Sequence, residues 1–159
     1  MNRPRLIILT GNIGSGKTTT VKEYASEGYH VVCRDDFRTM LGGGNYKFNV
    51  TTERAIHLAS RALIEGLMDE QLDIIVDETN VTKASRKSLI QLGKLYGYLI
   101  TGIVMPRLPK ATSLRNREKD DLRGSGLFVW SMVWDKFDKQ YEEPSLDEGF
   151  NSLMWKDRQ

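Results

Sequence analysis

The residues with the clearest chemical potential in this sequence form one run near its start. Residues 11–18 read Gly-Asn-Ile-Gly-Ser-Gly-Lys-Thr and match the pattern G-x-x-x-x-G-K-[ST] at every position. In this pattern the glycines let the backbone curl around nucleotide phosphates with its N–H groups pointing inward. Lys17 can reach the β- and γ-phosphates, and the Thr18 hydroxyl group can hold Mg²⁺. We therefore expect binding of ATP or another nucleoside triphosphate together with Mg²⁺.

The sequence around this run predicts a strand, a loop and a helix in that order. An apolar run at 6–9 is typical of a buried strand, and residues 18–25 can form a helix whose N-terminus faces the anion. A glycine-rich turn that matches by accident is the alternative, and the flanking elements argue against it. The residues expected at the nucleotide are Gly11, Asn12, Ile13, Gly14, Ser15, Gly16, Lys17, Thr18 and Thr19.

Short apolar runs alternate with helical patterns along the whole chain. Strands are expected at 6–9, 29–33, 73–76, 99–105 and 153–155. Residues 52–68 fit a helix with an apolar face made of Ala55, Leu58, Ala59, Ala62, Leu63 and Leu67. Residues 82–96 fit another helix, with Gly97 as its stop. This alternation predicts a single α/β domain over residues 1–159, with one parallel sheet between two layers of helices.

Polar residues follow the second strand at the edge where parallel sheets bind ligands. Asp35 could accept the proton of an attacking hydroxyl group during phosphoryl transfer. Arg38, one helical turn later, could bind an acceptor phosphate or hold that carboxylate, and Arg34 belongs to the same group. The alternative is that Asp35 or Asp36 caps the next helix and the arginines form surface pairs.

The third strand is followed by Asp77-Glu78-Thr79-Asn80. A carboxylate at this place can orient Mg²⁺ or its water shell. Asp77 is the first candidate and Glu78 the second, because a one-residue shift of the strand end exchanges them. Thr79 and Asn80 either line the acceptor site or start the next helix.

A basic segment ending in glycines follows the fourth strand, and we expect a helical lid at about 115–126. Its cations would offset the charge that builds on the transferred phosphoryl group. Arg115 and Lys119 are four residues apart and can face the same side of a helix. The alternative is an ordinary solvated helix face with mixed charges, and it has more weight for Arg117 than for the other cations.

Two further features have open interpretations. The loop at 42–49 either grips a substrate or is passive. Trp130, Trp134 and Phe137 repeat at helical spacing, which favours packing at the core or its rim over a platform for nucleobases.

The composition sets limits on partners and compartment. With 23 basic and 21 acidic residues, the net charge of +2 neither indicates nor excludes nucleic acid. Cys33 is the sole cysteine, so no disulfide forms within the chain, and this favours a reducing compartment. Signal-peptide cores and apolar runs of about 20 residues are lacking. We expect a cytoplasmic protein that does not bind membranes.

Together these motifs resemble the kinase domain of phage and bacterial 5′-polynucleotide kinases. The resemblance rests on the Gly-x-x-Gly-Ser-Gly-Lys-Thr run and on Arg34-Asp35-Asp36-Phe37-Arg38, Asp77-Glu78-Thr79-Asn80 and Arg115-Asn116-Arg117, in this order over most of the chain. It implies a P-loop NTPase fold with strand order 2-3-1-4-5. It also implies ATP-dependent, Mg²⁺-dependent phosphorylation of the 5′-hydroxyl end of DNA or RNA.

The resemblance implies a role for each matched position. Lys17 and Thr18 would handle the triphosphate and Mg²⁺, and Asp35 would be the general base. Arg38 would contact the phosphate next to the acceptor nucleoside, and Arg115 would begin the lid.

Three departures from that family are visible. The motif of the phage enzyme after the third strand resembles Ser-Asp-Thr-Asn, so Glu78 could replace Asp77 as the supporting acid. A second lid arginine is replaced by Lys119, so its role could pass to Arg123, because lysine lacks the bidentate fork. The phosphatase domain of many relatives is absent, so we expect a separate phosphatase or ligase as partner in end repair.

Two other functions fit the same residues. The first is a kinase for a small acceptor such as a nucleoside, nucleotide, sugar nucleotide or antibiotic, since one fold serves many substrates. The second is a nucleotide-dependent switch or nucleic-acid-binding module without transferase activity, which would not need a base at Asp35. The sequence leaves open the choice of DNA or RNA, the choice of ATP or GTP, and the oligomeric state.

Overall fold

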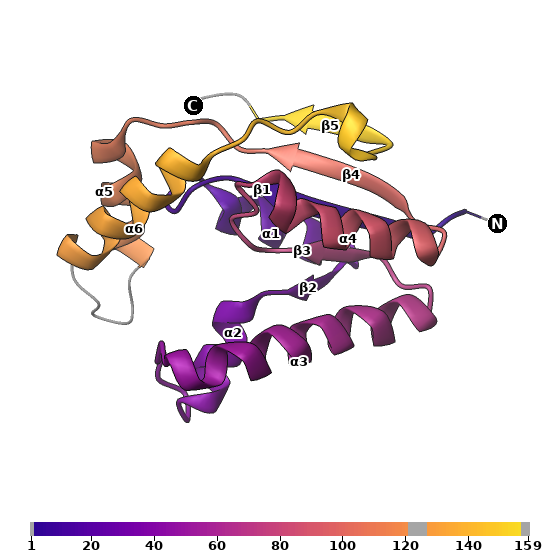
Figure 1. Cartoon of the computed structure of the whole chain (residues 1–159), viewed down its shortest axis with the longest axis horizontal. Helices are drawn as coiled ribbons and strands as arrows, with labels where there is room; N and C mark the ends of the chain where they lie inside the picture. Colours follow the sequence, from indigo (N-terminus) through magenta and orange to yellow (C-terminus); the bar gives the residue numbers. More distant parts are fainter. Residues whose placement is uncertain (1, 121–126, 157–159) are drawn as a thin grey trace.

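Five parallel strands form the centre of the computed structural model, in the order β2-β3-β1-β4-β5 (Figure 1). This count holds for the residues that the structure describes, 2–120 and 127–156. The strands are β1 (Arg5–Thr10), β2 (His30–Val32), β3 (Ile74–Val76), β4 (Leu99–Val104) and β5 (Ser152–Trp155). The α/β class, the parallel pairing and the expected strand order are confirmed.

The helices follow the strands as the sequence pattern predicts. They are α1 (Lys17–Ser26), α2 (Arg34–Leu41), α3 (Val50–Asp69), α4 (Lys83–Leu95), α5 (Lys110–Asp120) and α6 (Leu127–Gln140), with a short 3₁₀ turn, η1 (Leu146–Glu148). Thr82 caps α4 by accepting a hydrogen bond from the Ser85 backbone N–H. Gly97 follows the end of α4 with a φ of 79°, a left-handed conformation that glycine adopts at little cost.

Alternate residues of β1 pack into two separate hydrophobic layers. Leu6 and Ile8 contact the layer that contains Ile64 of α3 and Ile90 of α4. Ile7 and Leu9 contact the opposite layer, which contains Val21 of α1. The sheet is therefore buried on both faces, as parallel sheets require.

The expected apolar face of the helix at 52–68 is not the face that packs on the sheet. The buried residues of α3 are Ile56, Ser60, Ile64 and Met68. By contrast, Leu58 is 56% exposed and Leu63 is 42% exposed. This helix carries apolar residues on two sides, and the side with Ile56, Ile64 and Met68 removes more apolar surface from water than the alanine-rich side. The prediction of the helix is confirmed, and the prediction of its core face is wrong.

Helices α5 and α6 lie side by side at the carboxyl edge of the sheet (Figure 1). The helix that carries the expected lid begins at Lys110, five residues before the predicted start at Arg115. Residues 121–126, including Arg123, lie outside the described residues. Within the described ranges, no helix combines the length and the apolarity that membrane crossing requires.

Candidate active site

A cavity of about 890 Å³ opens at the carboxyl ends of β1, β2 and β3. It lies between the phosphate loop at 11–18, helix α2 and the helix pair α5–α6. Residues from all three regions line it: Ile13, Gly14, Gly16, Lys17, Thr18, Thr19, Cys33, Arg34, Asp35, Arg38, Tyr46, Phe48, Asp77, Glu78, Thr79, Asn116, Arg117, Lys119, Val129, Trp130, Val133, Lys136 and Phe137. The structure thus brings most of the predicted site residues to one cavity.

Lys17 occupies the phosphate-loop side of this cavity. Its Nζ donates hydrogen bonds to the carbonyl oxygens of Gly11 at 2.8 Å and Asn12 at 2.7 Å. Burial lowers the pKa of Lys17 to about 8, against the opposing effect of the Asp77 carboxylate. At neutral pH the side chain is therefore mostly an ammonium ion, held by the loop and facing the position of a triphosphate.

The first residues of the phosphate loop do not point their N–H groups into the cavity as expected. The N–H group of Gly11 donates to the Thr79 carbonyl at 2.9 Å. The N–H group of Ile13 donates to Oδ1 of Asn12 at 2.7 Å, and Nδ2 of Asn12 donates to the Trp134 carbonyl. Gly11 and Asn12 therefore form the back of the loop and anchor it to the loop after β3 and to α6. Ser15 is buried and does not line the cavity. The loop residues that line the cavity are Ile13, Gly14 and residues 16–19.

Asp35 and Arg38 face the same cavity from α2, one helical turn apart. Nη1 of Arg38 donates to Oδ1 of Asp35 at 2.7 Å. The other edge of the guanidinium group binds Glu53 of α3 in bidentate fashion, Nε to Oε1 at 2.9 Å and Nη2 to Oε2 at 2.7 Å. These hydrogen bonds raise the pKa of Arg38 and lower that of Glu53. Arg38 thus fixes the position of Asp35, while two carboxylates balance its charge.

Glu53 is a site residue that the sequence did not reveal. It lies in the first turn of α3, and no local pattern connects it to Arg38, fifteen residues earlier in the chain. Asp36, the neighbour of Asp35, is exposed and does not line the cavity. Of the two adjacent aspartates, only Asp35 faces the site.

Asp77 and Glu78, the acidic pair after β3, have different partners. Glu78 accepts a hydrogen bond from the Arg34 backbone N–H at 2.7 Å and forms an ion pair with its Nε at 3.1 Å. Glu78 therefore anchors the first turn of α2, the helix that presents Asp35. Burial raises the pKa of Asp77, the charge of Lys17 opposes that shift, and the carboxylates of Asp35 and Asp36 add to it. A cation beside Asp77 would therefore be favourable.

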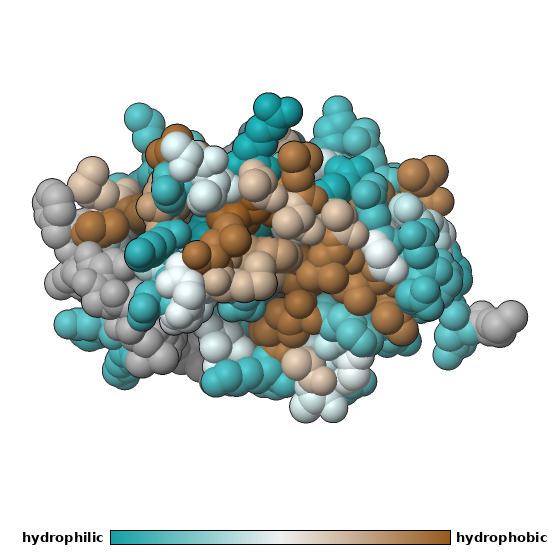
Figure 2. Space-filling model, turned by 90° about the horizontal axis from the view of Figure 1, so that it is seen from below, coloured by the Kyte–Doolittle hydropathy of each residue, from teal (hydrophilic) through white to brown (hydrophobic). Residues whose placement is uncertain are grey.

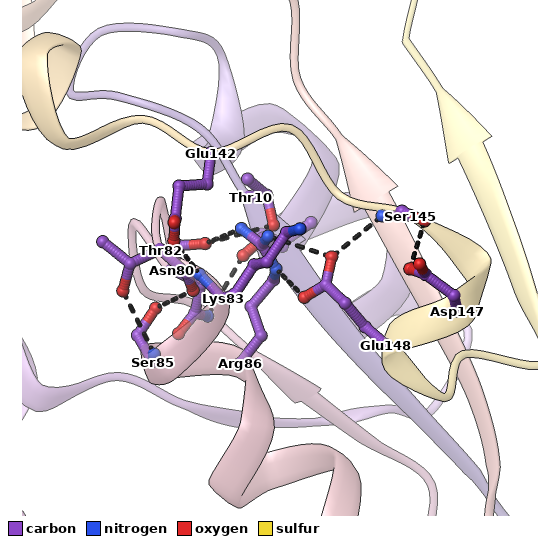
Figure 3. Close-up of polar contacts among 11 residues, drawn as sticks. Thr10, Asn80, Thr82, Lys83, Ser85, Arg86, Glu142, Ser145, Asp147 and Glu148 are labelled. Carbon is purple, nitrogen blue, oxygen red and sulfur yellow. Dashed lines mark hydrogen bonds and ion pairs between the residues drawn. The ribbon is translucent and has the colours of Figure 1, made fainter.

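Asn80 does not line the cavity, contrary to the expectation that it lines the acceptor site. It is buried, with a φ of 44°, and its Nδ2 donates to the Leu9 carbonyl at 3.1 Å. Its own carbonyl accepts a hydrogen bond from Nη1 of Arg86 at 2.8 Å, as Figure 3 shows. Arg86 in turn forms an ion pair with Glu148 of η1. Asn80 therefore fixes the loop after β3, and only Thr79 of that pair reaches the cavity.

The lid helix α5 presents a different arginine from the one predicted. Arg115 is exposed, bonds Thr112 at 3.4 Å and does not line the cavity. Arg117 does line it, with its guanidinium carbon 4.1 Å from the centre of the Trp130 ring. Two residues of an α-helix span about 200° of rotation, so Arg115 and Arg117 face opposite sides. Lys119 lines the cavity from an exposed position.

Helix α5 also packs directly on the phosphate loop. Nδ2 of Asn116 donates to the Gly14 carbonyl at 3.0 Å. A Cβ atom on Gly14, whose φ is +67°, would lie 2.0 Å from the Ser113 carbonyl oxygen. Glycine at this position therefore serves both the left-handed turn and the close approach of the lid helix.

Part of the cavity lining is apolar and aromatic. Tyr46 and Phe48 from the loop at 42–49 belong to it, together with Val133 and Phe137 of α6. Trp130, 7% exposed, lines the cavity beside Arg117. The expectation of packing holds for the buried Trp130 ring, but Trp130 and Phe137 are also cavity residues.

Comparison with known proteins identifies the family. Residues 6–144 match the sequence family described as AAA domain. The chain belongs to this AAA domain family. The match includes the phosphate loop, both carboxylate-bearing strand ends and the lid helices.

Solved structures share the fold of this AAA domain. One is a chain of the Pnkp1/Rnl/Hen1 RNA repair complex, 22% identical, with a TM-score of 0.68 over 89% of this chain and 47% of that one. Another is the Mycobacterium tuberculosis APS kinase CysC, 17% identical, with a TM-score of 0.60 over 100% of this chain and 92% of that one. A Sinorhizobium meliloti gluconokinase is 16% identical, with a TM-score of 0.59 over 98% and 83%. The chain spans less than half of the RNA-repair chain it resembles.

The family match and the phosphate loop together identify a P-loop domain whose cavity suits a nucleoside triphosphate. The residues present also fit Mg²⁺. Thr18 and Asp77 line the same cavity. Burial and the nearby carboxylates disfavour the charged form of Asp77, so a bound cation would stabilise its carboxylate. Among the described residues no cluster of three His, Cys, Asp or Glu side chains forms a metal site. Proteins usually hold Mg²⁺ through one or two side chains plus substrate phosphates.

Proposed function

We propose that this AAA domain transfers the γ-phosphate of ATP to the 5′-hydroxyl end of DNA or RNA. One observation carries the proposal. The Asp35 carboxylate faces the same cavity as Lys17 and Thr18, and aromatic residues line part of that cavity. This cavity suits a triphosphate, a hydroxyl group and a nucleoside together.

Each residue has a chemical task in this reaction. Asp35 takes the proton of the acceptor hydroxyl group as its oxygen forms a bond to the γ-phosphorus. The bond from that phosphorus to the β–γ bridging oxygen breaks, and ADP leaves. Lys17 and Arg117, which line the same cavity, offset the charge on the transferred group. Mg²⁺, held by Thr18 and Asp77, would neutralise phosphate charge.

The aromatic residues of the cavity favour a nucleoside end over a sugar acid as the phosphate acceptor. Tyr46, Phe48 and Phe137 offer apolar and aromatic surfaces on which a base can stack. Gluconate has no aromatic ring that could stack on these surfaces. Lys119 and Lys136 line the same cavity and suit the charge of a polynucleotide. The likeness to a chain of an RNA repair complex supports this proposal. A separate phosphatase or ligase would then be its partner in end repair.

A second candidate is a small acceptor without a phosphate beside its hydroxyl group. The bidentate contact between Arg38 and Glu53 favours it, because a strand phosphate must compete with two carboxylates for Arg38. The likeness to an APS kinase and a gluconokinase is compatible with this candidate. A nucleotide-dependent switch would have no use for a carboxylate held at the acceptor position.

The test uses γ-labelled ATP, Mg²⁺ and three acceptors: a 5′-hydroxyl oligonucleotide, the same strand with a 5′-phosphate, and a free nucleoside. We expect label on the 5′-hydroxyl strand alone. Asp35→Asn should lower kcat by about 10²- to 10⁴-fold with ATP binding retained. Asp36→Asn, one residue away but outside the cavity, is the matched control and should stay near wild type. Label on the nucleoside alone would select the second candidate, and no label on any acceptor would overturn both.

A further inference from the structure

Helix α3 exposes an apolar stripe on the side opposite to its core face. The stripe consists of Ala55, Leu58, Ala59, Ala62, Leu63 and Gly66, at helical spacings of three and four residues. Figure 2, which views the molecule from the α3 side, shows hydrophobic surface gathered over this region. A Cβ atom added to Gly66 would meet nothing within 4 Å. An exposed apolar surface of this kind marks an interaction site.

Charged residues lie along one flank of the α3 stripe, with the basic residues before the acidic residues in the direction of the chain. Arg54 and Arg61 lie in the N-terminal half of the helix, and Glu65 and Asp69 in the C-terminal half. At 100° per residue these four side chains fall within an arc of about 80°. Arg61 and Glu65 form an ion pair with each other at 3.4 Å, so the flank carries Arg54 toward one end and Asp69 toward the other.

We propose that the α3 stripe binds the α3 stripe of a second copy of this chain, with the two helices antiparallel. The charge order selects this occupant. In an antiparallel pair with a twofold axis near Ala62, Arg54 lies beside Asp69 of the second copy, and the reverse contact is identical. A parallel pair would place this flank against the opposite flank of the second copy, and the contact between Arg54 and Asp69 would not form.

The sizes of the stripe residues are also self-complementary in this register. Leu63 of one copy lies opposite Ala59 of the other, and Leu58 lies opposite Gly66. Ala62 faces itself near the axis. Large side chains thus meet small ones on both sides of the axis, which allows two helices to approach closely.

The proposed interface is small, and its size limits the affinity of the dimer. A helix of 20 residues is about 30 Å long, so one helix pair falls at the small end of specific interfaces. We expect a dimer that dissociates at micromolar concentrations and weakens with salt. None of the stripe residues lines the active-site cavity, so the dimer leaves that cavity open.

The first experiment is sedimentation equilibrium from about 1 to 200 µM, a range that spans the expected affinity. Wild type is expected to shift from monomer to dimer, and Ala62→Glu to remain a monomer throughout. Ala84→Glu, an equally exposed alanine on α4, is the matched control and should behave as wild type. A wild-type monomer at all concentrations, or a dimer unaffected by Ala62→Glu, would overturn the proposal.

A charge exchange then tests the antiparallel orientation. Arg54→Asp should weaken the dimer by about fivefold or more, and addition of Asp69→Arg should restore it. An Ala62→Cys variant should form an intermolecular disulfide, because the two cysteines would meet near the axis. The wild-type chain, whose sole cysteine is Cys33, should not. A double variant as weak as the single one would refute the antiparallel pair.

Discussion

Loss of the Glu148 carboxylate should destabilise the protein severely, through the ion pair with Arg86 that Figure 3 shows. The Arg86 side chain is fully buried and that of Glu148 is 9% exposed, with Nε–Oε1 at 2.8 Å and Nη2–Oε2 at 3.0 Å. Glu148→Gln leaves the guanidinium charge in the core without its counter-charge. Breaking one side of such a pair costs about 3–5 kcal/mol.

That loss is large for a domain of this size. A change of 1 kcal/mol moves the Tm of a domain of this length by about 2–4 °C, so Glu148→Gln should lower Tm by roughly 6–20 °C. Thermal unfolding followed by circular dichroism measures it. The control is Glu23→Gln, which removes an exposed contact to Lys156 at 3.6 Å and should cost less than about 1 kcal/mol.

A double variant that lacks both charges of the ion pair provides the second control. Arg86→Met combined with Glu148→Leu removes both charges, so most of the lost stability should return. A Glu148→Gln variant that unfolds within about 1 °C of wild type would refute the reasoning, because the buried charge would then cost almost nothing.

Three further predictions concern the site. Lys17→Met should abolish phosphoryl transfer. It should also raise the free energy of unfolding of the nucleotide-free protein by about 1–3 kcal/mol, because burial disfavours the lysine charge and lowers the pKa of Lys17 to about 8. A lower Tm for this variant would contradict the prediction. Arg117→Ala should reduce kcat by about 10²-fold or more, whereas the control Arg115→Ala should stay within about threefold in the same label-transfer assay. Glu53 has a pKa below its ordinary value of 4.5 because Arg38 donates hydrogen bonds to it, so its stabilising effect exists above that pH and is lost as the pH falls. The Tm gap between wild type and Glu53→Gln should therefore narrow as the pH falls below about 4, and a constant gap would rule this out.

Much of the fold and part of the site could be predicted because their determinants are local. The run at 11–18 contains its own turn residues, lysine and hydroxyl group, so the phosphate loop needs no distant contact to be recognised. The apolar runs and helical periods place the strands, and the strand ends place Asp35 and Asp77 at one edge. These features depend on spacing along the chain, which the sequence states directly.

Tertiary structure alone decided which equivalent residue faces the site and which helix face meets the core. Arg115 and Arg117 are equal as cations, and only the rotation of α5 against the phosphate loop turns Arg117 inward. Glu53 reaches Arg38 because α2 and α3 pack together, a contact that no local pattern encodes. Helix α3 carries apolar residues on two sides, so periodicity predicts the helix but not its orientation. Burial energy depends on what lies opposite each face, and that is known only after the whole chain has packed.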